Sequence, residues 1–88
     1  MMKIVPHDKP GRSRTGTLYD INVRVITEIL GFGPNVQDDP NKVVNSWGFK
    51  IGDEEFGIWD YKGSQEYGQF STYGNSAVLE KLFGVHYS

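Results

Sequence analysis

The side chains best suited to binding a ligand gather in two short stretches of the chain. Residues 59–64 read WDYKGS and combine two rings, a lysine, an open glycine N–H and a hydroxyl. Residues 71–74 read STYG and place more hydroxyls ahead of an expected helix start, where free N–H groups attract anions. Aromatic rings of this kind can stack on a nucleotide base or anchor a protein interface. The pattern predicts a contact surface made of Trp59, Tyr61, Lys62, Ser64, Ser71, Thr72 and Tyr73.

Residues that could carry out catalysis do not form a recognisable set in this sequence. His7 and His86 stand near opposite ends of the chain, and neither has metal-ligand or triad spacing around it. The acidic run Asp53-Glu54-Glu55 falls at an expected turn, where such side chains are normally solvated. The sequence contains no phosphate-binding loop, dinucleotide fingerprint or nucleophile elbow. We therefore expect a protein that is not an enzyme and that uses no metal and no cofactor.

Length and composition indicate one small domain. The chain has 88 residues, of which 38% are hydrophobic and 14% aromatic, enough for a core built largely from rings. The absence of cysteine excludes disulfides and zinc–thiolate sites. No apolar run approaches the roughly 18 residues of a membrane span, so we expect a cytoplasmic protein with no membrane contact. Small cores often gain stability by association, which favours a homodimer.

Charge is unevenly distributed along the chain. Residues 1–14 carry four basic side chains and one acidic side chain, a net charge of +3, whereas the remainder has a net charge of −5. So small a basic segment on an acidic body argues against general nucleic-acid binding. With two prolines, two glycines and no periodicity, residues 1–16 are predicted to be extended or flexible, with Ile4 and Val5 able to join a sheet edge. Residues 17–88 are expected to form the folded α+β domain.

The stretch from Thr17 to Leu30 is compatible with a strand or a helix. Alternating β-branched residues favour a strand, whereas apolar residues at helical spacing favour a helix. The ending decides between them, because Gly31 suits a left-handed C-terminal cap and Phe32 can fold back on the last turn as in a Schellman motif. We predict a helix over residues 21–30, capped at its start by Asp20 or Asn22.

Residues 43–61 predict a β-hairpin with both tryptophans on it. Two strands, 43–51 and 54–61, meet at Gly52-Asp53, a pair typical of two-residue hairpin loops. Counting outward from this turn places Phe49 opposite Phe56 and Trp47 opposite Ile58 on one apolar face, which we assign to the core. The other face pairs Lys50 with Glu55, Gly48 with Gly57, Ser46 with Trp59 and Val44 with Tyr61. Because glycine weakens a strand, the Gly48–Gly57 pair predicts close approach by another molecule, beside a Trp59 exposed to the outside.

The C-terminal third of the chain predicts a short strand and a second helix. Residues 69–73 can add a third antiparallel strand. Asn75 suits the start of a helix whose apolar face carries Val78, Leu79, Leu82 and Phe83, and Gly84 suits its end, with Val85 folding back. The expected order is helix, β-hairpin, optional third strand and helix, in a single α+β domain.

Several short motifs resemble small uncharacterised proteins carried by bacteriophages and prophages. The resemblance covers residues 20 to 87 approximately and rests on LGFGPN at 30–35, SWGF at 46–49, IWDYKGS at 58–64, STYG at 71–74 and LFG at 82–84. It implies an accessory protein acting in the cytoplasm of a bacterial host, where such proteins commonly bind a host factor or sequester a signalling molecule of host immunity. No chemistry is attached to these motifs in the family.

The sequence therefore predicts a non-catalytic binding protein, with Gly48 and Gly57 added to the contact surface defined above. The favoured partner is a host defence protein that the chain inhibits. The alternative is a small anionic ligand, such as a signalling nucleotide, held by residues 59–64 and 71–74. A third reading is that the aromatic surface forms a homodimer interface.

Overall fold

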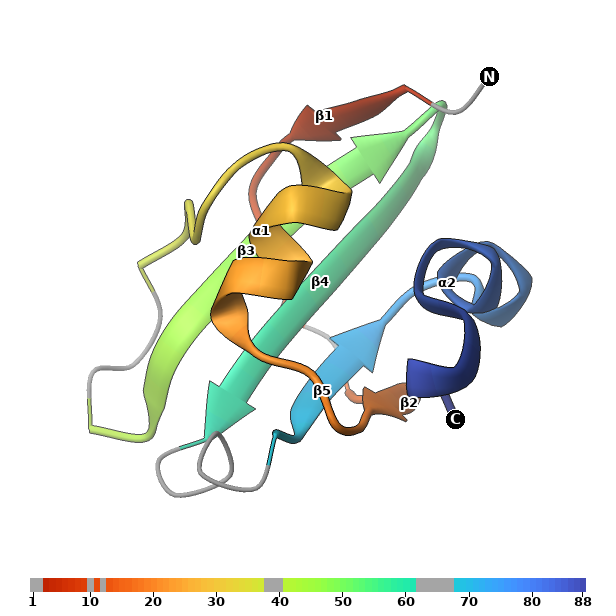
Figure 1. Ribbon diagram of the computed structural model, residues 1–88. Helices are drawn as coiled ribbons and strands as arrows, with labels where there is room; N and C mark the ends of the chain where they lie inside the picture. The colour runs from red at the N-terminus through yellow and green to blue at the C-terminus, as the bar shows by residue number, and fades with distance from the viewer. Residues whose placement is uncertain (1–2, 10, 12, 38–40, 62–67) are drawn as a thin grey trace.

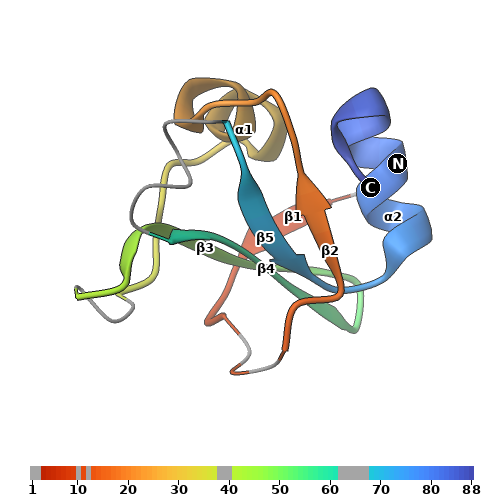
Figure 2. The same ribbon diagram turned by 90° about the horizontal axis from the view of Figure 1, so that it is seen from below.

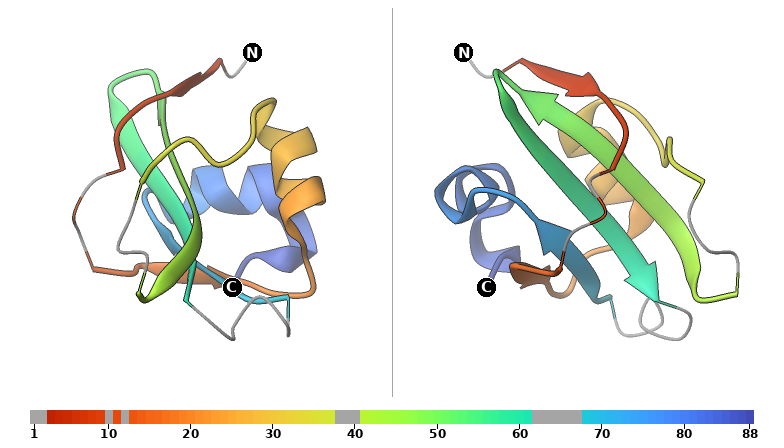
Figure 3. Two further views of the ribbon diagram at one scale, coloured as in Figure 1. Left: turned by 90° about the vertical axis from the view of Figure 1, so that its left-hand side faces the viewer. Right: turned by 180° about the vertical axis from the view of Figure 1, so that it is seen from behind.

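Five antiparallel strands and two helices form the fold in a computed structural model, which describes residues 3–9, 11, 13–37, 41–61 and 68–88. The sheet has the strand order β1-β3-β4-β5-β2, and both helices lie on one of its faces (Figure 1; Figure 3, left). We call this the inner face and the opposite one the outer face. The predicted α+β class is confirmed. In chain order the elements are β1 (Ile4–Pro6), β2 (Gly16–Leu18), α1 (Val23–Leu30), β3 (Val43–Ile51), β4 (Glu54–Tyr61), β5 (Phe70–Tyr73), α2 (Ser76–Phe83) and the 3-10 turn η2 (Gly84–His86).

The predicted hairpin is confirmed in its register from the turn to Ser46. Phe49 lies opposite Phe56, and Gly48 lies opposite Gly57. Gly52 takes a φ of 62° at the turn, a conformation that glycine adopts at little cost. Beyond Ser46 the register shifts by one residue, so Tyr61 pairs with Val43 and the predicted pairing with Val44 is wrong.

A buried carboxylate accounts for this shift. Asp60 is fully buried and accepts hydrogen bonds from the backbone N–H groups of Val44 and Asn45, at 3.2 and 2.6 Å. The Asn45 side-chain amide donates a third, to the other carboxylate oxygen, at 3.0 Å. A β-bulge leaves the extra residue without a partner in the ladder, and here the Asp60 side chain accepts the two N–H groups at that place. Periodicity alone could not reveal this, because the cause is a side chain on the partner strand.

The ambiguous stretch 17–30 contains both structures: Thr17 and Leu18 end the strand β2, and residues 23–30 form helix α1, which begins two residues later than predicted. The Asn22 side chain accepts a hydrogen bond from the Val25 N–H at 3.0 Å, which confirms Asn22 as the cap. At the other end, Gly31 has a φ of 92° and donates its N–H to the Thr27 carbonyl at 2.8 Å. This single bond is the simpler left-handed ending, in place of the predicted Schellman motif.

Helix α2 begins at the predicted cap, since the Asn75 side chain accepts hydrogen bonds from the Ala77 and Val78 N–H groups. Its ending differs from the prediction. Gly84 leads into the η2 turn, and Val85 is 97% exposed instead of folding back. Tyr87 packs on the core in its place, with its hydroxyl donating to Ser76 Oγ at 3.0 Å.

The core lies between the inner face and the two helices, and it contains the four hairpin residues assigned to it. The rings of Phe49 and Phe56 stack 5.2 Å apart, and Trp47 meets Phe70 edge-on at 6.0 Å. The indole N–H of Trp47 donates to the Phe32 carbonyl at 3.3 Å, which ties the end of α1 to β3. The fully buried apolar side chains are Leu18, Ile26, Trp47, Phe49, Phe56, Ile58 and Leu79.

The N-terminal residues belong to the sheet. β1 pairs with β3 at one edge, as expected for Ile4 and Val5, whereas β2 pairs with β5 at the opposite edge. The chain between them must therefore cross the sheet, and it does so over the outer face (Figure 3, right). We call residues 7–15, of which 7–9, 11 and 13–15 are described, the strap.

Candidate functional site

The outer face of the β3–β4 hairpin carries the predicted glycine pair and Trp59, but it is covered. Trp59 is only 4% exposed, so the expectation that its ring faces the outside is wrong. The Lys9 ammonium of the strap lies 4.4 Å from the centre of the indole ring, in a cation–π contact. Alternation along the strand does turn Trp59 away from the core, as predicted. The covering element comes from the far end of the chain.

At Gly48 the strap backbone lies directly against the sheet. The His7 N–H donates to the Gly48 carbonyl at 2.9 Å, and a Cβ added at Gly48 would overlap the strap backbone between His7 and Lys9. At Gly57 an added Cβ would meet the Lys9 side chain instead. The glycine pair therefore does permit close approach, as predicted, and in this structure the approaching segment is the chain's own.

Asn35 fastens the strap to β3 from the side. Its amide nitrogen donates to the Gly48 and His7 carbonyls, at 3.0 and 3.2 Å, while its amide oxygen accepts the Gly48 N–H at 3.0 Å. One side chain thus satisfies backbone groups of both segments. This role could not be predicted from the sequence, because nothing local distinguishes Asn35 from other turn asparagines.

The remaining predicted site residues lie in different environments. Tyr61 is 46% exposed at the end of β4. Ser71 and Thr72 are buried on β5, and Thr72 faces the core beside Ile58, with a hydroxyl that has no hydrogen-bond partner. Lys62 and Ser64 lie outside the described residues. The described members of the predicted surface are therefore split between a covered face, a buried strand and one exposed ring.

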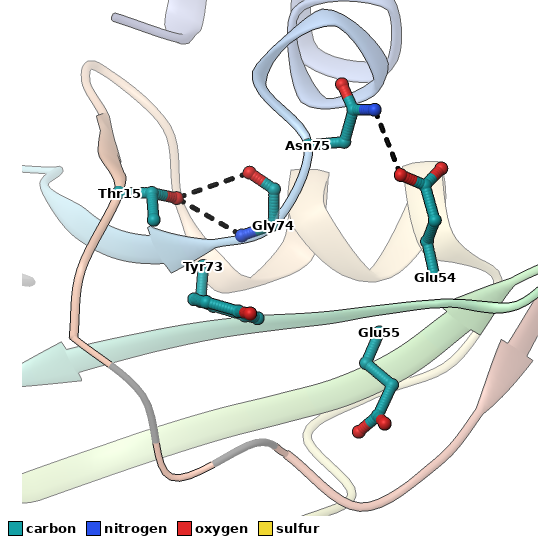
Figure 4. A pocket seen from close by; sticks show the side chains of 6 residues that line it. All are labelled: Thr15, Glu54, Glu55, Tyr73, Gly74 and Asn75. Carbon is teal, nitrogen blue, oxygen red and sulfur yellow. Dashed lines mark hydrogen bonds between the residues drawn. The ribbon is translucent and has the colours of Figure 1, made fainter.

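Tyr73 lines a pocket that the sequence did not predict (Figure 4). The pocket has a volume of about 420 Å³ and lies where β5 ends and the chain turns into α2. Figures 1 and 2 show that the chain leaves the sheet there, while β4 continues past the end of β5. Its lining residues are Thr15, Glu54, Glu55, Tyr73, Gly74 and Asn75.

Hydrogen bonds connect the segments around this pocket. Thr15 Oγ1 accepts the Gly74 N–H at 3.1 Å and donates to the Gly74 carbonyl at 3.3 Å. The Asn75 amide donates to Glu54 Oε1 at 3.0 Å, which places a carboxylate near the positive end of α2. Two carboxylates make this pocket unsuited to an anion, and Glu54 has an ordinary role as a favourable charge at a helix start.

In the described part of the chain, no three His, Cys, Asp or Glu side chains are grouped so that they could hold a metal ion. His86 makes a 2.9 Å contact through Nδ1 with the Tyr19 carbonyl, while His7 is exposed on the strap. None of the described helices is long and apolar enough to cross a membrane.

Fold and site together define a small α+β domain whose five-stranded antiparallel sheet is covered by helices on one face and crossed by its own strap on the other. Comparison of the chain with protein-family models, with curated proteins and with solved structures finds no match.

Proposed function

We propose that this protein is a non-catalytic binding domain that acts on another protein, with Tyr61 and Val44 at the centre of the contact. The observation that carries the proposal is the exposure of these two side chains, 46% and 49%, at one end of the β3–β4 hairpin. Most other large side chains of the hairpin are buried, so this exposure is a local feature of its end. Tyrosine is among the residues that contribute most to binding energy in protein interfaces.

The resemblance to phage-encoded proteins extends this proposal to the kind of partner. The partner is a bacterial host protein, in particular one of host defence, and binding inhibits it. A small anionic ligand has less support, because Ser71 and Thr72 are buried and the pocket beside Tyr73 carries two carboxylates.

Site-specific photocrosslinking tests the Tyr61 contact. A photoreactive phenylalanine analogue at position 61 should crosslink one predominant protein in bacterial cells that express the chain. The same analogue at Tyr19, which is similarly exposed and follows the edge strand β2, two strands away from β4, is the matched control. With the purified partner, Tyr61→Ala should weaken binding by about tenfold or more, as expected for an interface anchor. The same crosslinks at both positions, or none at 61, would contradict the proposal.

A further inference from the structure

The strap makes three contacts with the outer face that together describe a way of recognising an extended peptide. Its His7 N–H binds the Gly48 carbonyl, its His7 carbonyl accepts the Asn35 amide, and its Lys9 ammonium lies over Trp59. Two of these contacts involve only backbone atoms of the strap. The third requires a cation two residues further along. We call Gly48, Gly57, Trp59 and Asn35 the glycine site.

Apart from the Trp59 ring that it covers, the strap buries little apolar surface. Its described residues other than Lys9 are exposed, and β1, which leads into it, has three residues and an exposed Val5. Lifting residues 7–9 would break the His7 hydrogen bonds and the contacts of Lys9, its cation–π contact among them, while Thr15 stays bonded to β5 and the core between sheet and helices stays intact. Segments with so few apolar contacts open at a much lower free energy than the whole fold.

The glycine site beneath the strap, unlike the strap, keeps its structure when the strap is lifted. Trp59 presents a large ring. Gly48 has no side chain to shield its backbone, and the strap backbone from His7 to Lys9 lies in the space that a side chain would fill. Asn35 also bonds both backbone groups of Gly48, so the amide remains held against β3 when the strap leaves. The geometry for receiving a peptide is therefore preorganised on the sheet, which lowers the cost of binding.

We propose that the glycine site binds an extended, lysine-bearing segment of the partner protein, and that the strap occupies it in cis as an intramolecular competitor. This inference rests on the proposed function, because the segment belongs to the same partner protein that contacts Tyr61. The glycine site is then a second area of contact with that partner. A tethered competitor has an effective concentration of the order of millimolar, so the site stays closed until a partner segment displaces the strap.

Binding of a free peptide to a full-length variant with a weakened strap tests this proposal. The variant His7→Pro with Lys9→Ala removes the donor to Gly48 and the cation over Trp59, and it leaves all four residues of the glycine site unchanged. The probe is a synthetic peptide of residues 3–15, and the readout is the indole N–H resonance of Trp59. We expect the peptide to bind the variant at least tenfold more tightly than it binds the wild-type chain, because the competitor in cis is weaker.

A second peptide with Lys9→Ala tests the role of the cation. It should bind the variant at least about twofold more weakly than the native peptide, because a cation–π contact to a ring shielded from water contributes more than an exposed one. Equal affinity for wild type and variant, equal affinity of the two peptides, or no change at Trp59 up to about 1 mM peptide, the scale of the tethered competitor, would overturn the proposal. Failure here leaves the Tyr61 crosslinking result untouched, because Tyr61 is exposed with the strap in place.

Discussion

Gly48 and Gly57 face each other across the β3–β4 pair, but a side chain added at each would meet different atoms. At Gly48 the obstacle is strap backbone, which cannot move without breaking the His7–Gly48 hydrogen bond. At Gly57 the obstacle is the Lys9 side chain from its Cγ onward, which can move aside by rotating about its first side-chain bond, with loss of the contact to Trp59. A side chain is therefore harder to accommodate at Gly48 than at Gly57, although the two glycines lie on the same face of the hairpin.

This difference predicts the outcome of two matched substitutions. Gly48→Ala should lower the free energy of unfolding by about 1–3 kcal/mol, the usual cost of overpacking, and should release the strap. Gly57→Ala should be close to neutral, because the gain from replacing a strand glycine offsets the loss of the Lys9–Trp59 contact. Urea denaturation measures both values. Equal losses for the two variants would mean that the strap does not pack against Gly48.

The unpartnered Thr72 hydroxyl predicts a stabilising substitution. Thr72→Val keeps the shape of the side chain and removes a buried polar group without a hydrogen bond, so unfolding should cost about 1 kcal/mol more. Thr15→Val is the control, since the Thr15 hydroxyl bonds Gly74 and its loss should destabilise the protein. Thermal unfolding followed by circular dichroism distinguishes the two directions. A destabilised Thr72→Val variant would indicate that the hydroxyl has a partner in solution.

At the scale of elements, β3 and β4 are held in their shifted register by one side chain. Asp60 is fully buried and accepts three hydrogen bonds, all from Val44 and Asn45. A buried carboxylate is tolerated only when it is satisfied in this way. The end of the hairpin that exposes Tyr61 therefore depends on Asp60 for its geometry.

Asp60→Ala should consequently cost about 3 kcal/mol, because it leaves three partly buried donors without their acceptor. Asp53→Ala at the exposed hairpin turn should change the stability by no more than about 0.5 kcal/mol. Both values follow from urea denaturation. If the two variants were equally stable, the bulge would not depend on the carboxylate.

At the scale of the whole molecule, one chain covers both faces of its own sheet. Trp59 is buried by the strap of the same chain, and the radius of gyration of 11.6 Å is close to the value of about 12 Å expected for a folded chain of this length. The aromatic residues that favoured a homodimer in the sequence analysis are thus largely covered without a second copy.

We therefore expect light scattering to give the monomer mass of 9.9 kDa at micromolar concentrations. Twice that mass would revive the homodimer interpretation. In that case Tyr61→Ala should restore the monomer if the exposed end of the hairpin forms the dimer interface, and Tyr19→Ala should not.

The sequence by itself determined those features whose cause is local. The Asn22 and Asn75 caps, the left-handed Gly31 and the hairpin register from Gly52 to Ser46 each depend on residues within a few positions or on a strict period of two. The residues on the core face of the hairpin followed from the same period.

Only the tertiary structure decided what covers the outer face. His7 and Gly48 are far apart along the chain, as are Lys9 and Trp59, and neither residue of either pair carries a local pattern that names its partner. Bare backbone at Gly48 and Gly57 predicted that something lies close, but a missing side chain does not specify what occupies the space. That information resides in the path of the chain, because β1 and β2 join opposite edges of one sheet and the strap must cross between them.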